Sequence, residues 1–138
     1  MANEAVLRTE LALPIQMTVN NSQAIEKGAF LRLFDPRVAS GAGIDLTGQQ
    51  CAGIAAGEKI LNDGVTTLAI YRDGVFDVHA SGAVLIGDAV MMAEANDVMS
   101  MPNSAASGAM IADLSSKRIG TALEAATDNE TFQIHLRI

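Results

Sequence analysis

Histidine and carboxylate side chains are the groups of this chain whose chemistry could support acid–base catalysis or metal binding. His79 and His135 each stand alone within a run typical of a β-strand. Asp73, Asp77 and Asp88 lie at expected turns and strand ends, where carboxylates commonly accept hydrogen bonds from backbone N–H groups. No nucleophile, base and orienting group occur together. We therefore expect surface or interface roles for the histidines and no catalytic residues, metal or cofactor; a cation bound at the turns is the less favoured alternative.

Two short motifs could indicate nucleotide chemistry. Ala42-Gly43-Ile44-Asp45-Leu46 is similar to the Ala-Gly-Tyr-Asp-Leu motif of the trimeric dUTP pyrophosphatases, and Tyr71-Arg72 is similar to another part of that family. The other motifs of that family, including its Gly-rich C-terminal motif with arginine, have no counterpart in this sequence. Gly41-Ala42-Gly43 lacks the third glycine and the helix pattern of a dinucleotide fold. A dUTP pyrophosphatase-like hydrolase is therefore the weaker alternative.

Charge and hydropathy exclude several classes of partner. The chain of 138 residues has a formal net charge of −7, and its nine Lys and Arg residues are scattered, which argues against nucleic-acid binding. No apolar run approaches the roughly 20 residues of a membrane helix, so we expect a soluble chain. Cys51 is the single cysteine and cannot form an internal disulfide, and the sequence does not open with a charged and then apolar leader pattern, so we expect synthesis in a reducing cytoplasm.

The elements that would position these groups are expected to be β-strands, organised around residues 66–79. Two β-rich runs flank Asp73-Gly74, a dipeptide that favours a two-residue hairpin turn. Such a turn would place Tyr71 opposite Phe76 on an apolar face. The other face would mix apolar residues with Asp77 and His79, which suggests that a second subunit covers it.

Similar sequence segments occur before and after this hairpin and predict an internal duplication. The segments 24–31, 52–56 and 67–70 have the same order of apolar and glycine residues as the segments 83–90, 119–123 and 131–134. In this alignment Gly28 and Gly87 are equivalent turns, and Asp88 follows the second of them. A pseudo-symmetric β-barrel or sandwich is the architecture that one pair of copies favours.

The N-terminal segment has the alternating pattern of an edge strand. Five apolar residues alternate with others, and a proline, which cannot donate to a β-ladder, interrupts the run. We predict that residues 1–20 form a docking arm that pairs with a neighbouring subunit or another partner, and that residues 21–138 form a single β domain. The residues assigned to docking are Leu11, Leu13, Pro14, Ile15, Met17 and Val19.

The remaining segments are assigned as two long loops and one closing strand. Residues 34–50 and 94–116 lack clean periodicity and carry proline and glycine, so both are predicted to be loops. Residues 121–127 favour a strand followed by a loop over a helix. Residues 131–138 alternate strictly, with Phe132, Ile134, Leu136 and Ile138 predicted to face inward.

Taken in order, several of these motifs resemble the head-decoration, or capsid cement, proteins of tailed bacteriophages. The resemblance covers about residue 23 to the C-terminus and depends on order and spacing. It implies a small, trimeric protein that binds the outside of a capsid at three-fold and quasi-three-fold positions, with the major capsid protein as its partner. The motifs are Ile25-Glu26-Lys27-Gly28, Ala52-Gly53-Ile54-Ala55, Gly74-Val75-Phe76, Ile86-Gly87-Asp88-Ala89-Val90 and Ile119-Gly120-Thr121-Ala122-Leu123-Glu124.

We therefore predict a mainly β protein: a small, pseudo-duplicated β-barrel or β-sandwich, β-tulip-like, with long loops and an extended N-terminal arm. The predicted function is a non-enzymatic cement protein on the outer surface of the virion, made in the host cytoplasm. The main alternative is a β-sandwich binding module of a phage fibre or adhesin.

Overall fold

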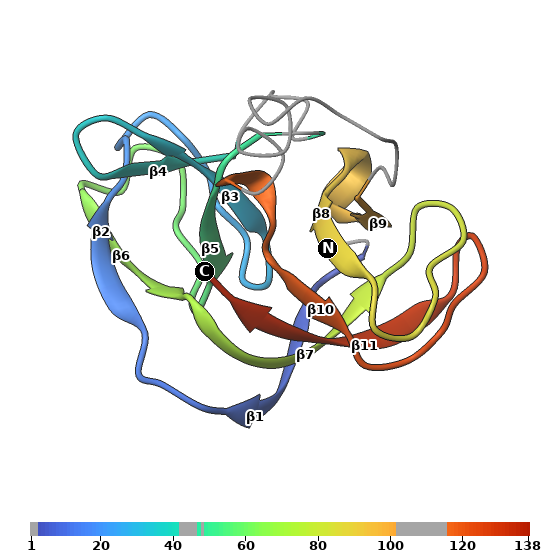
Figure 1. Ribbon diagram of the computed structural model, residues 1–138. Coiled ribbons are helices and arrows are strands. Elements are labelled where there is room, and N and C mark those ends of the chain that lie inside the picture. Colours follow the sequence, from blue (N-terminus) through green and yellow to red (C-terminus); the bar gives the residue numbers. More distant parts are fainter. Residues whose placement is uncertain (1–2, 42–46, 48, 102–115) are drawn as a thin grey trace.

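The computed structural model describes residues 3–41, 47, 49–101 and 116–138, and its regular structure is almost entirely β (Figure 1). The strands fall into a closed five-stranded barrel and a six-stranded sheet. This confirms the predicted β class. The elements are β1 (Val6–Glu10), β2 (Ile15–Thr18), β3 (Phe30–Phe34), β4 (Val38–Ser40), β5 (Cys51–Ala55), β6 (Thr67–Tyr71), β7 (Asp73–His79), β8 (Ala89–Met92), the 3-10 turn η1 (Glu94–Asn96), β9 (Val98–Ser100), β10 (Gly120–Ala122) and β11 (Thr131–Arg137).

The first barrel has the strand order β2-β4-β3-β5-β6 and closes on itself. β2 pairs antiparallel with β6 on one side, and on the other a parallel pair joins Thr18 to Val38 of β4. Its interior holds a cluster of buried apolar side chains that includes Met17, Leu31 and Ile70. Closure leaves no free edge among the five described strands of this barrel.

The second sheet has the order β1-β7-β11-β10-β8-β9 and repeats the first barrel strand for strand. β7, β11, β10, β8 and β9 correspond to β2, β6, β5, β3 and β4. A parallel bridge between Ala80 and Val98 brings β9 back to the end of β7, as the Thr18–Val38 pair does in the first barrel. β1 is the additional strand. The predicted duplication is confirmed.

The turns at Gly28 and Gly87 show the repeat in detail (φ +82° and +85°). Each turn follows an isolated bridge, Ile25–Lys59 in one half and Val84–Ala126 in the other. The N–H group of Gly28 donates to the carbonyl of Ala55 at 2.9 Å, and that of Gly87 donates to the equivalent carbonyl of Ala122 at 2.8 Å. Positive φ is the conformation that glycine adopts at low cost. Both are the turns that the sequence predicted.

A second glycine pair sits where two strands approach most closely. A Cβ atom on Gly53 of β5 would lie 2.2 Å from the carbonyl oxygen of Tyr71, and one on Gly120 of β10 would lie 1.9 Å from that of His135. Tyr71 ends β6, and His135 lies in the equivalent strand β11. The two halves are therefore also equivalent in this close backbone contact, which leaves no room for a Cβ atom at either position.

The hairpin predicted at Asp73-Gly74 is wrong. β6 belongs to the first barrel and pairs with β2 and β5, whereas β7 pairs with β1 and β11. Asp73 and Gly74 lie inside β7, opposite Arg137 and Leu136. Local turn preference yields here to pairing between distant strands, and Gly74 serves close packing, because a Cβ atom would lie 3.0 Å from the carbonyl oxygen of Thr9.

The prediction of an arm outside the folded core is wrong for most of residues 1–20. β1 pairs with β7, and β2 supplies the strand that closes the first barrel. Ala5, Met17 and Val19 are buried. The alternating pattern does mark a strand, but the strand is used within its own chain. Pro14 lies between β1 and β2, where its missing N–H group breaks no ladder.

The two predicted loops contain short strands. Residues 34–50 include β4, and residues 94–116 include η1 and β9; residues 42–46, 48 and 102–115 lie outside the described part of the chain. β11 matches the predicted closing strand, with Phe132, Ile134 and Leu136 buried. Ile138 was predicted to face inward but is 37% exposed, because it lies beyond the end of the ladder.

The barrel and the second sheet share one apolar core. A single cluster joins Phe30 and Ile54 of the barrel to Phe76 and Phe132 of the sheet. The side chain of Asn96 in η1 adds a polar link, since it accepts from the N–H group of Phe30 at 2.7 Å and donates to the carbonyls of Asn3 and Gly28. The two halves are therefore packed against one another by apolar and polar contacts.

Candidate functional site

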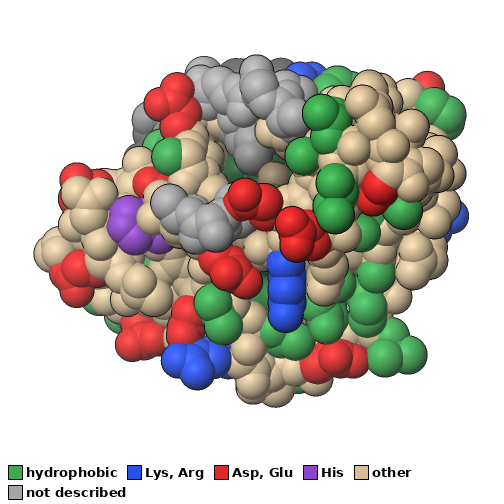
Figure 2. All heavy atoms as spheres, turned by 180° about the vertical axis from the view of Figure 1, so that it is seen from behind, with side chains coloured by type: hydrophobic (Ala, Val, Ile, Leu, Met, Phe, Trp, Pro, Cys, Tyr) green, Lys and Arg blue, Asp and Glu red, His purple; other side chains and the backbone are tan. Residues whose placement is uncertain are grey.

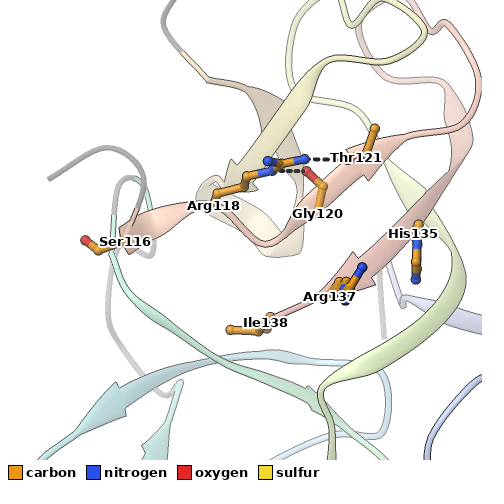
Figure 3. Close-up of a pocket in the computed structure, with 7 residues that line it drawn as sticks. All are labelled: Ser116, Arg118, Gly120, Thr121, His135, Arg137 and Ile138. Atoms are coloured by element: carbon orange, nitrogen blue, oxygen red, sulfur yellow. Dashed lines mark hydrogen bonds between the residues drawn. The ribbon is translucent and has the colours of Figure 1, made fainter. Parts of the chain in front are cut away.

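One groove lies at the end of β10 and β11 and carries two arginines (Figure 3). Its volume is about 620 Å³. Arg118 donates from Nε to the carbonyl of Gly120 at 3.2 Å and from Nη2 to Oγ1 of Thr121 at 2.7 Å, so its guanidinium is held over β10. Its described lining residues are Ser116, Arg118, Gly120, Thr121, His135, Arg137 and Ile138.

A second groove of about 560 Å³ lies on the first barrel and combines apolar side chains with two further arginines. Arg37 donates to the carbonyl of Gln16 at 3.3 Å, and Arg72 donates to the carbonyl of Ala52 at 3.1 Å. Its described lining residues are Ile15, Met17, Leu33, Phe34, Asp35, Arg37, Gln50 and Arg72.

The two grooves adjoin at the junction of the barrel and the sheet. The side chain of Gln50 in one groove contacts Oγ of Ser116 in the other at 3.5 Å, and the N–H group of Ile138 donates to the carbonyl of Arg72 at 3.1 Å. We call the described lining residues of both grooves the seam surface. On the face drawn in Figure 2, Asp and Glu side chains are spread widely, with few Lys or Arg among them.

The histidines and aspartates that could do chemistry are used in pairs. His79 Nδ1 lies 2.7 Å from Asp97 Oδ1, and His135 Nε2 lies 3.1 Å from Asp73 Oδ1. Asp88 accepts from the N–H group of Leu85, as a turn carboxylate is expected to do. Among the described residues no group of three or more His, Cys, Asp or Glu could hold a metal ion. Each histidine therefore has a structural role as the partner of an aspartate.

Cys51 is buried in the shared core. Burial raises the pKa of its thiol to about 12, although the hydrogen bond to the backbone of Gly53 and the charge of Arg72 act in the opposite direction. The thiolate is therefore scarce at neutral pH, which makes the side chain a poor nucleophile.

The two pyrophosphatase-like motifs gain no support from the structure. Tyr71 packs its ring edge-on against the ring of Phe76, with 5.7 Å between the ring centroids, and the motif at residues 42–46 lies outside the described residues.

The residues assigned to docking are divided by the fold. Leu11 and Leu13 in the β1–β2 connector are 52% and 80% exposed, and Pro14 between them and β2 is half-buried. Ile15 is 37% exposed and lines the first-barrel groove, Met17 is buried and also lines that groove, and Val19 is buried in the barrel. The exposed apolar stretch is thus residues 11–15, next to the seam surface.

Sequence reasoning missed the arginines of the seam surface. They stand at positions 37, 72, 118 and 137, far apart in the chain and without a common motif. Only the pairing of β-strands brings them to adjoining grooves, so no spacing pattern could have found them.

The fold and this surface define a class of protein: a duplicated all-β protein in which arginines and apolar side chains share one surface. The phage cement protein family model matches residues 12–138, and the chain belongs to that family. No curated protein matches the sequence. Among the described residues, no helix has the length and apolar character needed to cross a membrane.

One solved structure is similar in fold. The N base of the head fiber gp8.5 of bacteriophage phi29 superimposes with a TM-score of 0.54 at 12% sequence identity, covering 88% of this chain and 91% of that chain. At this identity the likeness concerns the fold. β1, by contrast, lies outside the region that the family model matches.

Proposed function

We propose that this chain is a non-enzymatic capsid decoration protein that binds the outside of a viral head at three-fold and quasi-three-fold sites and stabilises the shell. The observation that supports this best is membership of the phage cement protein family over residues 12–138, which include the first barrel and nearly all of the second sheet. The partner would be the major capsid protein, after synthesis in the host cytoplasm.

The docking contact that we assign to the connector is apolar. Leu11 and Leu13 are more than half exposed, and they lie between two strands that fix the ends of the segment. Burying such side chains contributes about 25 cal/mol per Å² of apolar surface removed from water. Because the segment is anchored at both ends, docking would order few residues and the entropy cost would be small.

We also infer that the protein acts as a homotrimer. A three-fold position presents three equivalent surfaces, and a rigid trimer engages them together, so that weak individual contacts gain avidity. Light scattering across a concentration series should give a species near three times 14.4 kDa. A monomer at every concentration would contradict the trimer.

Co-sedimentation with purified expanded heads tests the proposed function. Wild-type protein should pellet with heads, and Leu11→Ser/Leu13→Ser should pellet at least tenfold less while unfolding at nearly the same temperature. The matched control is Leu85→Ser/Ile86→Ser, which changes side chains that are 67% and 71% exposed on the other half of the molecule. Absence of wild-type protein from the pellet would contradict decoration, and equal binding by the first variant would contradict docking through the connector.

A binding module of a phage fibre is the second candidate, because the fold resembles a head fiber base. Such a module would bind glycans and would not bind isolated heads. A glycan array beside the co-sedimentation assay separates the two functions.

A further inference from the structure

The seam surface differs in charge from the molecule as a whole. The chain has 16 acidic and nine basic residues. Four of those nine, the arginines at 37, 72, 118 and 137, line the two adjoining grooves, and Asp35 is the one carboxylate side chain among the described lining residues. A positive surface on a protein of net charge −7 indicates a local use for that charge.

Three of these guanidinium groups are held in place by neutral acceptors. Arg37 and Arg72 donate to backbone carbonyls, and Arg118 donates to a carbonyl and a hydroxyl. Among the described residues, Arg8 pairs with Asp77 and Lys59 with Asp63 outside the grooves, whereas His135 of the second-sheet groove pairs with Asp73. Arg37, Arg72 and Arg118 are therefore oriented by neutral groups, and their N–H groups not used in these contacts can serve a ligand.

Apolar side chains lie directly beside these charges. Ile15, Leu33 and Phe34 line the same groove as Arg37 and Arg72. Arginine and aromatic residues are enriched at protein interfaces, and the core of an interface is more apolar than the rest of the surface. A groove built only for a free anion would not require that apolar lining.

We propose that the seam surface recognises a carboxylate-bearing segment of the capsid shell, with the four arginines receiving Asp or Glu side chains. This inference rests on the proposed function. Arginine binds carboxylates in a bidentate manner, and the partner's apolar residues would cover the lining beside them. A nucleic acid fits less well, since a long polyanion would be repelled by the net charge of −7, whereas a short acidic segment meets only the groove.

Charge reversal in the second-sheet groove provides the test. Arg118→Glu/Arg137→Glu should lower the affinity for purified heads at least tenfold at about physiological salt, and wild-type binding should weaken as salt rises. Arg37→Glu, in the other groove, should weaken binding in the same direction. The matched control is Lys27→Glu, an exposed residue outside both grooves that undergoes the same change in charge. All variants should retain the wild-type melting temperature within a few degrees.

The outcomes distinguish failure of the carboxylate-binding inference from failure of the proposed function. If wild-type protein binds heads and the folded double variant binds equally well, the seam surface is not the contact and the inference fails while decoration stands. If wild-type protein does not bind heads, both the decoration function and the proposed partner in the capsid shell are contradicted. Retention of a short DNA duplex by wild-type protein and its loss in the double variant would overturn the carboxylate assignment in favour of phosphate.

Discussion

The first barrel and the second sheet have the same strand order, but a buried lysine distinguishes the barrel from the sheet. Lys59 of the barrel is equivalent to Ala126 of the sheet, because Lys59 forms the isolated bridge with Ile25 and Ala126 forms the corresponding bridge with Val84. The Lys59 side chain is fully buried; its Nζ donates to the carbonyls of Asn21, Gln23 and Ile60 and lies 3.4 Å from Asp63. The duplicated fold therefore does not require this lysine, and the barrel uses it to hold its own loops.

The shared features are those that the backbone requires. Both halves keep a glycine at the close strand approach and a positive-φ glycine at the turn. Both also carry a carboxylate that accepts backbone N–H donation, Asp63 in the loop between β5 and β6 and Glu130 in the loop between β10 and β11. The comparison indicates that these shared positions preserve the topology while other side chains have diverged.

The largest expected effect is at the close strand approach. Gly120→Ala should prevent folding or lower the free energy of unfolding by at least about 3 kcal/mol, because the new Cβ would overlap a backbone carbonyl that cannot move without separating β10 from β11. Gly53→Ala should be similarly severe. Urea denaturation measures both. A mild effect at one site only would break the equivalence of the two halves.

Replacing the buried lysine should affect the barrel alone. Lys59→Met should cost about 2 to 4 kcal/mol, because three carbonyls lose their donor and Asp63 loses its nearest cation. Amide exchange should show the loss in β2–β6 first. Lys27→Met, at an exposed lysine, is the control and should change stability by less than about 0.5 kcal/mol. Equal effects would mean that the buried contacts of Lys59 stabilise nothing.

Substitution of the two turn glycines should cost different amounts of folding stability, although the two residues have nearly equal φ angles. Gly87→Ala should cost about 1 kcal/mol from positive φ alone, since no atom lies within 4 Å of its added Cβ. Gly28→Ala should cost about 1 kcal/mol or more beyond that, because its Cβ would overlap Glu4 and the carbonyl of Ala5. Thermal unfolding of both variants compares them. The reverse order would contradict the packing of the N-terminal segment on the first barrel.

The turn carboxylates should give the smallest effect. The N–H group of Val65 lowers the pKa of Asp63, and Thr127 lowers that of Glu130 through its hydroxyl and its N–H group. A pKa lower in the folded than in the unfolded state adds stability above the unfolded pKa, which is lost as pH falls through the folded pKa. Asp63→Asn and Glu130→Gln should therefore each reduce the drop in melting temperature between pH 7 and pH 3. An unchanged drop in both would contradict this role.

How much the sequence revealed depended on the range of the interaction. The repeat, the turn glycines and β11 were predictable because glycine spacing and alternation are local signals. The predicted Asp73-Gly74 hairpin and the separate arm failed because strand partners are chosen over long distances: β7 pairs with β11, and β2 closes a barrel. The seam surface arises only after those pairings form, so it could not be predicted from spacing.

Cryo-electron microscopy of expanded heads incubated with the protein tests the central claim most directly. The account predicts density at three-fold and quasi-three-fold positions on the outer surface, with the arginine grooves and residues 11–15 turned toward the shell. Heads that remain bare, or density in which these surfaces face solvent, would contradict it.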